Sequence, residues 1–334
     1  MKLSVIIPYY NTNALIGRTL DSLLDQDLAP SDFEIIVVDD GSDEDPVVVK
    51  EYADRCPQVS YYRNEHIGVS AARNFGMSLA KGDWIYFCDS DDYIQSNVLG
   101  GIIDAAEQRG LDMLHARRTM LKPSDPVPAP RRNFDRVSET QTGMEYLGNP
   151  PYDLTWSMCV SILRRSFIED LGLQFEDIFY VEDCLFKLEV LKNVKKVAFI
   201  DVDLYYYMQN EVSILHSKKQ HDSDAHAEAT LRSIEAKTAI INDPATPESA
   251  ARSLAAGRRD DSIGLFTNVL RYCPVQKTID CFNRLEAIGA YPIDETETKN
   301  RGSRIIRALV NHKQLWIFIC RVFHIIPLKL RLRT

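Results

Sequence analysis

The chain has 334 residues, 45% of them hydrophobic and 26% charged, and its formal net charge is −9. A chain of this size and composition can bury a large core, so we expect a globular protein with one large α/β domain and a smaller part. Its acidic balance excludes a general affinity for nucleic acid, and its seven scattered cysteines lack the CxxC pairs or histidine spacing of a structural zinc site.

Up to about residue 117, short apolar runs alternate with helical patterns, which is typical of a parallel sheet covered by helices. The opening MKLSVIIPYYN is too short for the apolar region of a signal peptide, so it is predicted to be the first strand. The expected strands are Leu3–Pro8, Glu34–Asp39, Val59–Arg63, Trp84–Asp89 and Asp112–Ala116. The expected helices are Ala14–Leu24, Val47–Arg55, Val69–Lys81 and Gln95–Arg109. Ligands of such sheets collect at the carboxyl ends of the strands.

Lys122–Arg132 (KPSDPVPAPRR) is rich in proline without periodicity and is expected to be an extended loop, although such spacing is also found in recognition motifs. From Thr142 to about Ser217 the pattern is mixed, and beyond it the pattern is helical. In these regions we expect a helix at Glu182–Leu191, strands at Val197–Ile200 and Leu204–Met208, and helices at Ala225–Ile241, Pro247–Leu270 and Val275–Ile288.

The first motif with chemical potential is VVDDGS (Val37–Ser42), in which an apolar strand runs directly into two carboxylates, a glycine and a hydroxyl. A carboxylate at the end of a strand, such as Asp39, can accept a hydrogen bond from the N3–H of a uracil. Gly41 permits a tight turn that lets a ligand approach the backbone. The same pattern is also typical of an ordinary turn in which Ser42 or Asp43 caps the next helix.

The second motif is Asp89-Ser90-Asp91-Asp92, which follows the apolar run WIYFC. Three carboxylates within four residues repel one another unless a cation lies among them, and oxygen ligands suit Mg²⁺ or Mn²⁺. A solvated acidic turn with a helix cap is the alternative. Because the preceding strand is expected to be buried, we favour the metal site.

Two further segments place charged residues at expected helix N-termini. In HIGVSAARN (His66–Asn74), small residues let a helix begin close to a ligand, so its N–H groups and Arg73 can face a phosphate or a base; a packed helix with an exposed arginine is the alternative. In FYVEDCLF (Phe179–Phe186), Glu182 and Asp183 begin a helix, where carboxylates are commonly caps or dipole partners. A transferase that inverts configuration needs one carboxylate to take the acceptor's proton, and we assign this role to Asp183, with Glu182 in reserve.

Taken together and in this order, the segments resemble the family 2 glycosyltransferases of bacterial polysaccharide synthesis. The likeness covers about residues 1–215, including LYYYMQNEVSI, a tyrosine-rich strand followed by a Ser-Ile pair. The matching segments are SVIIPYYN (Ser4–Asn11), VVDDGS (Val37–Ser42), GVSAARNFG (Gly68–Gly76), GDWIYFCDSDDY (Gly82–Tyr93) and VEDCLF (Val181–Phe186).

The resemblance implies a GT-A fold, a mixed α/β sheet flanked by helices, over residues 1–215, followed by a mostly helical region at 216–334. It also implies site residues. Asp91 becomes the principal metal ligand, with Asp89 near the ribose or metal and His216 as a further metal or diphosphate contact, although a lone histidine is more often solvated. Trp156 lies near the acceptor cleft or is a core tryptophan. The donor-binding set is Pro8, Tyr9, Asn11, Asp39, Gly41, Gly68, Arg73, Asp89 and Ser90.

The expected function is therefore metal-dependent, inverting transfer of a sugar to a hydroxyl of a glycan or lipid-linked oligosaccharide. The resemblance favours a UDP-sugar as donor and Mn²⁺ or Mg²⁺ as cofactor. Two alternatives are a non-catalytic sugar-nucleotide or glycan-binding module of the same fold and a sugar nucleotidyltransferase. The latter needs a glycine-rich loop with Arg and Lys after the first strand, which PYYNTNALIGR does not supply.

The C-terminal segment is expected to lie at a membrane surface. Residues 301–334 contain eight Lys and Arg and no Asp or Glu, and Leu315–Leu330 is too short and interrupted for a span of about 20 apolar residues. An interfacial helix within 313–334 fits this pattern, and a helix docked on the protein's own core is the alternative. The cysteine pattern favours a reducing compartment, so we expect a cytoplasmic protein that is peripheral on the inner face of the membrane.

Overall fold

The computed structural model describes all residues except 153, 179, 210–222, 295–300 and 326–334. The chain forms two compact units. The first comprises Met1–Tyr146, Pro150–Asp177 and Glu182–Ser217, and the second comprises Leu147–Asn149, Ile178–Val181 and Lys218–Thr334.

The first unit is built on one nine-stranded mixed sheet with the order β3-β2-β1-β4-β8-β6-β9-β5, and β7 pairs with β9. β1, β2, β3 and β4 are mutually parallel, whereas β8 runs antiparallel to both β4 and β6. This mixed α/β architecture is the expected fold class. The strands are β1 (Leu3–Tyr9), β2 (Phe33–Asp39), β3 (Val59–Arg63), β4 (Trp84–Phe87), β5 (Tyr93–Ile94), β6 (Met113–Leu121), β7 (Arg132–Val137), β8 (Ser161–Arg164) and β9 (Val197–Met208).

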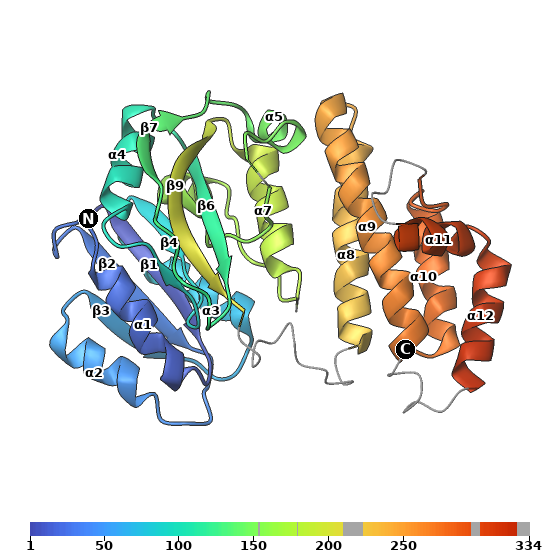
Figure 1. The fold of residues 1–334 in the computed structure, drawn as a ribbon, viewed down its shortest axis with the longest axis horizontal. Helices are drawn as coiled ribbons and strands as arrows, with labels where there is room; N and C mark the ends of the chain where they lie inside the picture. Colours follow the sequence, from blue (N-terminus) through green and yellow to red (C-terminus); the bar gives the residue numbers. More distant parts are fainter. Residues whose placement is uncertain (153, 179, 210–222, 295–300, 326–334) are drawn as a thin grey trace. The chain divides into compact units, whose positions relative to one another are not determined.

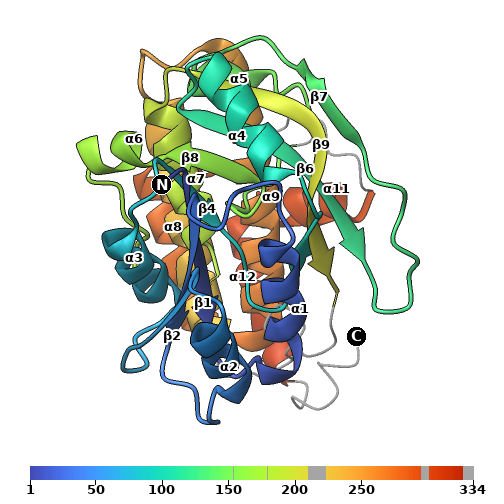
Figure 2. The same ribbon diagram turned by 90° about the vertical axis from the view of Figure 1, so that its left-hand side faces the viewer.

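Helices cover both faces of this sheet, which is why β1 and β2 are buried along their whole length. Figure 2 shows α1 and α2 on one side of β1 and β2, with α3 on the other. The helices are α1 (Asn13–Leu24), α2 (Val47–Arg55), α3 (Val69–Leu79), α4 (Leu99–Gln108), α5 (Gly143–Gly148), α6 (Arg165–Asp170) and α7 (Glu182–Asn193).

Several elements differ from the sequence-based expectation. The two strands expected at Val197–Ile200 and Leu204–Met208 are one continuous strand, β9, because it pairs with β6 on one side and with β7 and β5 on the other. β6 is correspondingly longer than predicted. α4 begins at Leu99 and not at Gln95, because the pairing of Tyr93 and Ile94 with β9 continues in a hydrogen bond from the Gln95 N–H to the Leu204 carbonyl. The sequence analysis did not predict β7, β8, α6 or α11 (Arg301–Val310).

The second unit is helical, with α8 (Ser223–Ile241), α9 (Glu248–Tyr272), α10 (Val275–Ala287), α11 and α12 (Lys313–Ile325). α8 and α9 lie along each other (Figure 1). The core of this unit includes Phe266, Phe282 and Trp316. The Phe266 ring contacts both of the other two rings.

α12 is docked on the protein's own core through one face, the arrangement that the sequence analysis named as the alternative to an interfacial helix. Trp316, Ile317 and Cys320 are buried in the core of the second unit, so one face is docked on the protein. Phe318, on another face, is 61% exposed, and Leu315 and Val322 are also exposed. Within the described residues, no helix combines the length and apolar character needed to cross a membrane.

Candidate active site

Three parallel strands bring the sequence motifs to one edge of the sheet. β1 and β2 pair so that Tyr9 lies opposite Asp39, and β4 pairs with β1 on its other side. The residues that follow these strands therefore emerge at the same edge. This edge holds Asn11, the turn Asp40–Ser42 and the acidic segment Asp89–Asp92, as the strand pattern predicted.

The buried Asp39 carboxylate fixes the turn after β2 through hydrogen bonds. Its Oδ1 accepts a hydrogen bond of 2.8 Å from the Ser42 N–H, while its Oδ2 accepts from Tyr61 at 2.7 Å and from Arg63 at 3.3 Å. Burial raises the pKa of Tyr61 to about 12, with further contributions from the hydrogen bond and the charge of Asp39. Tyr61 therefore stays a neutral donor, and Asp39 fixes both the turn and a polar ring on β3.

Asp40 and Gly41 bind the loop before α3 to this turn. The Asp40 carboxylate accepts from the backbone N–H groups of Ile67 and Gly68, at 2.8 and 3.0 Å. Gly41 has φ +75°, and a Cβ there would lie 2.8 Å from the backbone nitrogen of His66. A side chain at this position is therefore excluded both by conformation and by space.

Tyr9 and Asn11 shape the end of β1. The Tyr9 hydroxyl donates to Asn13 Oδ1 at 2.9 Å, and burial, followed by the charge of Asp39, raises the Tyr9 pKa to about 12. Asn11 has a positive φ of 52°, and its side chain both accepts from the Asp43 N–H and donates to the Asp43 carboxylate. Pro8 precedes Tyr9, the last residue of β1.

The exposed Tyr10 ring stacks on the His66 ring, with centroids 4.6 Å apart. The sequence analysis missed this pair.

The acids after β4 divide into different roles. Asp92 is buried and turns inward, where it accepts hydrogen bonds from the Met208 N–H, at 2.6 Å, and from the Tyr205 hydroxyl. Ser90 is held by Thr12 and Thr19 of the α1 region, at 2.9 and 3.1 Å. Asp89 and Asp91 are only partly buried. The segment therefore presents two carboxylates toward solvent, not three.

These two carboxylates are the residues that can hold a cation. Burial and the neighbouring Asp89 charge raise the pKa of Asp91 to about 6, and a backbone hydrogen bond and the Arg18 charge offset this only in part. Asp89 is already paired with Arg73, so Asp91 is the more available carboxylate, and carboxylate oxygens suit a hard divalent cation that also binds diphosphate oxygens and water. In the part of the chain that the structure describes, no cluster of three or more metal-ligating side chains is present, and His216 lies outside that part.

Arg73 lies in the first turns of α3, which packs directly on β1. A Cβ at Gly76 would lie 2.5 Å from Ile6 Cγ2, so the glycine allows the close approach of helix and strand. Arg73 is only 3% exposed, and its guanidinium lies 5.2 Å from the centre of the Phe175 ring. The alternative of an exposed arginine on a packed helix is thus wrong.

The Arg73 guanidinium joins three carboxylates from two distant segments. Nη2 lies 3.0 Å from Asp89, and Nη1 lies 3.0 Å from both Glu182 and Asp183. Burial alone lowers the pKa of Arg73, but the charges of Asp183, Asp89 and Glu182 more than reverse this and raise it above the ordinary value. The arginine is therefore a permanent cation that connects the acidic segment after β4 with the start of α7.

Both carboxylate oxygens of Asp183 have a partner. Its Oδ2 accepts from the Met158 N–H at 3.3 Å, and its buried Oδ1 is the atom that pairs with Arg73 Nη1 at 3.0 Å. Burial raises the pKa of Asp183 to about 6, the Arg73 charge lowers it, and the Asp89 and Glu182 charges raise it. Asp183 is thus ionised at neutral pH and more basic than an ordinary aspartate.

Lys187 was missed by the sequence analysis. It lies one helical turn after Asp183 on α7, is fully buried, and donates to the Ser157 carbonyl at 3.2 Å. Burial lowers the pKa of Lys187 to about 7 despite the nearby Asp183 charge. A lysine in the otherwise apolar run CLFKLEVL, four residues after the candidate base, was the signal that could have identified it.

Trp156 is partly buried and lies in the segment that contacts Asp183, two residues before Met158. Its assignment to the acceptor cleft stays a prediction. The described contacts bring Arg73, Asp89, Glu182 and Asp183 together directly, and they place Asp39, Gly41 and Gly68 in the adjacent loop network.

Comparisons with known proteins agree on the family of this chain and on its fold. Residues 4–172 match the sequence profile of the family described as glycosyl transferase family 2. A Bacillus subtilis (strain 168) protein described as the uncharacterized glycosyltransferase EpsJ is 32% identical over 250 residues, which covers 72% of this chain and 69% of EpsJ. The poly(ribitol-phosphate) beta-N-acetylglucosaminyltransferase TarS of Staphylococcus aureus (strain Mu50 / ATCC 700699) is 30% identical over 210 residues, 62% of this chain but only 35% of TarS.

Among solved structures, S. aureus TarS 1–349 in complex with UDP-GlcNAc superimposes with a TM-score of 0.66 and 21% sequence identity. The superposition covers 97% of this chain and 90% of that structure. At this identity the likeness shows the fold, which is the expected GT-A type. The profile match and the likeness to EpsJ establish that the chain belongs to glycosyl transferase family 2.

Proposed function

We propose that this glycosyltransferase moves a sugar from a UDP-sugar to a hydroxyl of a glycan or lipid-linked acceptor in polysaccharide synthesis, with inversion at the anomeric carbon. The observation that carries the proposal is the shared arginine: Arg73 holds Asp89, on the donor edge, and Asp183, the candidate base, at 3.0 Å each. An arrangement of this kind puts a base and a donor-binding acid beside one another, as a single displacement requires.

The donor side of the proposal rests on the sheet edge and on a relative's ligand. Asp39, the Gly41 turn and the Gly68 N–H form a hydrogen-bonded rim at the ends of β1 and β2. The structure of TarS, which shares the fold, was determined with UDP-GlcNAc. We therefore assign the nucleoside to the Tyr9–Asp39 region and the diphosphate to the side near Asp89 and Asp91.

The acceptor side rests on Asp183. In the proposed reaction, the acceptor oxygen attacks C1 of the sugar, the bond from C1 to the diphosphate oxygen breaks, and Asp183 takes the hydroxyl proton. A pKa of about 6 leaves the carboxylate ionised at neutral pH, while burial makes it a better base than a solvated aspartate. Its Oδ1 pairs with Arg73 Nη1 at 3.0 Å, whereas Oδ2 accepts only the longer hydrogen bond from the Met158 N–H, at 3.3 Å, so we assign the proton to Oδ2. Glu182 shares the Arg73 ion pair and helps to fix Asp183.

A divalent cation fits the carboxylates that face solvent. Asp91, with Asp89, would hold Mn²⁺ or Mg²⁺ beside the donor diphosphate, and the raised pKa of Asp91, which reflects burial next to the Asp89 charge, supports this. Such a cation would stabilise the negative charge that develops on the leaving diphosphate. His216 is retained only as a further candidate contact.

A screen of UDP-sugars by thermal unfolding, with and without Mn²⁺, tests the proposal. The donor that binds raises the melting temperature by mass action, and the same sugar nucleotide should be hydrolysed slowly to UDP and free sugar. The configuration of the released sugar, read by proton NMR, should be opposite to that of the donor. Binding without any release of UDP would favour a non-catalytic module, and synthesis of a sugar nucleotide from a nucleoside triphosphate would favour a nucleotidyltransferase.

We also propose that α12 contacts an anionic membrane surface at the cytoplasmic face. The support is its exposed apolar face, with Leu315, Phe318 and Val322, next to the exposed Arg321. A chain ending at Asn300 would lose Val310, Trp316, Ile317 and Cys320 from the core, so substitution is the sharper test. Phe318→Ser should reduce sedimentation with phosphatidylglycerol vesicles severalfold. The control is Val127→Ser, at an exposed loop residue of the first unit, which should leave sedimentation unchanged. Equal sedimentation of the two variants would contradict the proposed membrane contact.

A further inference from the structure

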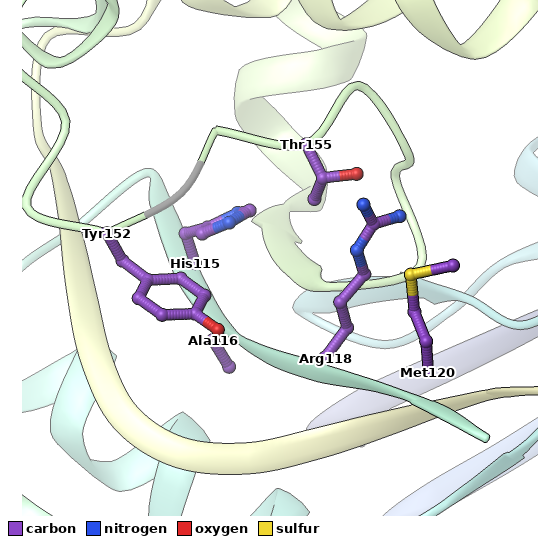
Figure 3. A pocket seen from close by; sticks show the side chains of 6 residues that line it. All are labelled: His115, Ala116, Arg118, Met120, Tyr152 and Thr155. Carbon is purple, nitrogen blue, oxygen red and sulfur yellow. The ribbon is translucent and has the colours of Figure 1, made fainter.

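A cavity of about 190 Å³ lies in the first unit, along β6. It is lined by His115, Ala116, Arg118, Met120, Tyr152 and Thr155. Figure 3 shows the Arg118 guanidinium directed toward Thr155, with the His115 and Tyr152 rings on the other side. The volume is several times the ~30 Å³ that one water molecule occupies in the liquid, so it accommodates a small ligand group.

An irregularity in β6 creates this lining. The pairing of β6 with β9 shifts register between His115 and Arg117 and again between Arg117 and Arg118. In a regular strand His115 and Arg118 would point to opposite faces, because side chains alternate. The bulge instead brings both to the cavity and leaves Arg117 to pair with Asp201.

The cavity presents positive charge and hydrogen-bond donors. Within the described residues, Arg118 has no hydrogen bond or ion pair, and the six lining residues include no acid. His115 is fully buried, and its Nε2 has no hydrogen-bond partner. Its Nδ1 lies 2.9 Å from Ser161 Oγ and 3.5 Å from Lys187 Nζ. Because Nδ1 already has these two partners, Nε2 is the ring nitrogen that is left for a ligand.

Two connections link residues that line the cavity to the candidate base and to the donor edge. Thr155 lines it and belongs to the same short segment as Met158, whose N–H donates to Asp183. Arg118 lies opposite Tyr205 in the β6–β9 register, and the Tyr205 hydroxyl binds Asp92 and lies 3.5 Å from Asp89. A group in the cavity would therefore be close to both the base and the donor edge.

We propose that this cavity binds an anionic group of the acceptor, a phosphate or a carboxylate, next to the hydroxyl that receives the sugar. The inference rests on the proposed function for the identity of the acceptor side. An arginine without a counter-ion is matched best by an oxyanion, to which the guanidinium donates two parallel hydrogen bonds. Burial is the main reason why the pKa of Lys187 is lowered, and the Arg118 charge adds to this against the opposite effect of Asp183, so the Arg118 charge acts on the helix that carries the candidate base.

Inorganic phosphate is the probe for the test, read by histidine side-chain NMR on the full chain labelled with ¹⁵N-histidine. Phosphate, added at constant ionic strength with chloride, should shift the His115 Nε2 signal in a saturable way, the signal being assigned with His115→Gln. Arg118→Gln should weaken this binding at least tenfold, and Arg118→Lys should retain part of it. The matched control is Arg136→Gln, which removes an arginine that is 77% exposed on β7 and should leave phosphate binding unchanged.

Two outcomes would overturn the proposal. Phosphate could leave the His115 signal unmoved in the unaltered chain, or could shift it equally in Arg118→Gln. Displacement of the phosphate by UDP or by a UDP-sugar would also overturn it, because the cavity would then belong to the donor. A parallel titration with acetate distinguishes a carboxylate from a phosphate as the preferred group. Since no step of this test needs donor turnover, its failure is distinguishable from failure of the proposed transfer.

Discussion

Asp89 and Asp183, which follow β4 and begin α7 respectively, contact the two terminal nitrogens of the same arginine. Arg73 Nη2 lies 3.0 Å from Asp89, and Nη1 lies 3.0 Å from Asp183. With Glu182 also on Nη1, three carboxylates surround one buried cation and leave a local excess of negative charge. This cluster connects donor binding with base catalysis in the proposed account.

Replacing Arg73 by lysine should destabilise the fold by about 3 kcal/mol, because one ammonium cannot reach both carboxylate groups and leaves buried acids unpaired. Equilibrium urea unfolding at pH 7 measures the loss. Arg252→Lys on α9 is the matched control, since its weak pair with Glu248 is largely exposed and should contribute less than about 1 kcal/mol. Equal stability of Arg73→Lys and the unaltered chain would contradict the described ion-pair cluster.

Asp183→Asn should stabilise the folded protein at pH 7.5. The pKa of Asp183 is raised from 3.8 to about 6 by burial, so the folded state disfavours its charge. The resulting cost is absent below the unfolded pKa, grows as the pH rises from about 4 to about 6, and is complete above that range, at about 3 kcal/mol. Unfolding of the variant and the unaltered chain at pH 7.5 and near pH 4 should show a gain only at the higher pH. A variant that is less stable at pH 7.5 would contradict the raised pKa.

The rate of UDP-sugar hydrolysis at saturating donor should fall below pH 6. Asp183 must be ionised to accept a proton, and its pKa of about 6 places the loss of the basic form there. Each further unit of acidity should lower the rate about tenfold. The slow residual rate of Asp183→Asn should lack this acid limb. If that variant kept the same limb, another group would be responsible for it.

Asp91→Asn should remove the Mn²⁺-dependent part of donor binding. If Asp91 holds the cation beside the diphosphate, loss of its charge leaves only Asp89 on that side. The melting-temperature increase caused by the UDP-sugar should then be the same with and without Mn²⁺. Asp125→Asn, at an exposed turn carboxylate, is the control and should keep the dependence. A full Mn²⁺ response in Asp91→Asn would exclude Asp91 as a ligand.

Local sequence patterns predicted the parallel strands of the first unit and the residues at their carboxyl ends. Apolar strands that run into acids identified β1, β2 and β4 and placed Asp39 and Asp89 at one sheet edge, because parallel strands end together. Irregular pairing was not accessible in this way. The bulge in β6, and hence the shared orientation of His115 and Arg118, depends on the partner strand β9, which is distant in the sequence.

The direction of individual polar side chains was also not predictable from spacing. Asp91 and Asp92 are neighbours of the same residue type. The Asp92 carboxylate accepts hydrogen bonds from the Tyr205 hydroxyl and the Met208 N–H, so of the two only Asp91 can bind a cation. Arg73 was expected near the donor, and the structure places it in an ion-pair cluster whose partners lie far along the chain. Tertiary contacts decide such cases.

The most direct test of the account is the turnover of Asp183→Asn with the UDP-sugar that stabilises the protein best. Hydrolysis at saturating donor should fall by about 10²–10⁴-fold, the range for loss of a general base, while calorimetry should give a donor Kd within about twofold of the unaltered chain. Turnover at the normal rate with the same donor affinity would show that Asp183 is not the base and would contradict the proposed mechanism.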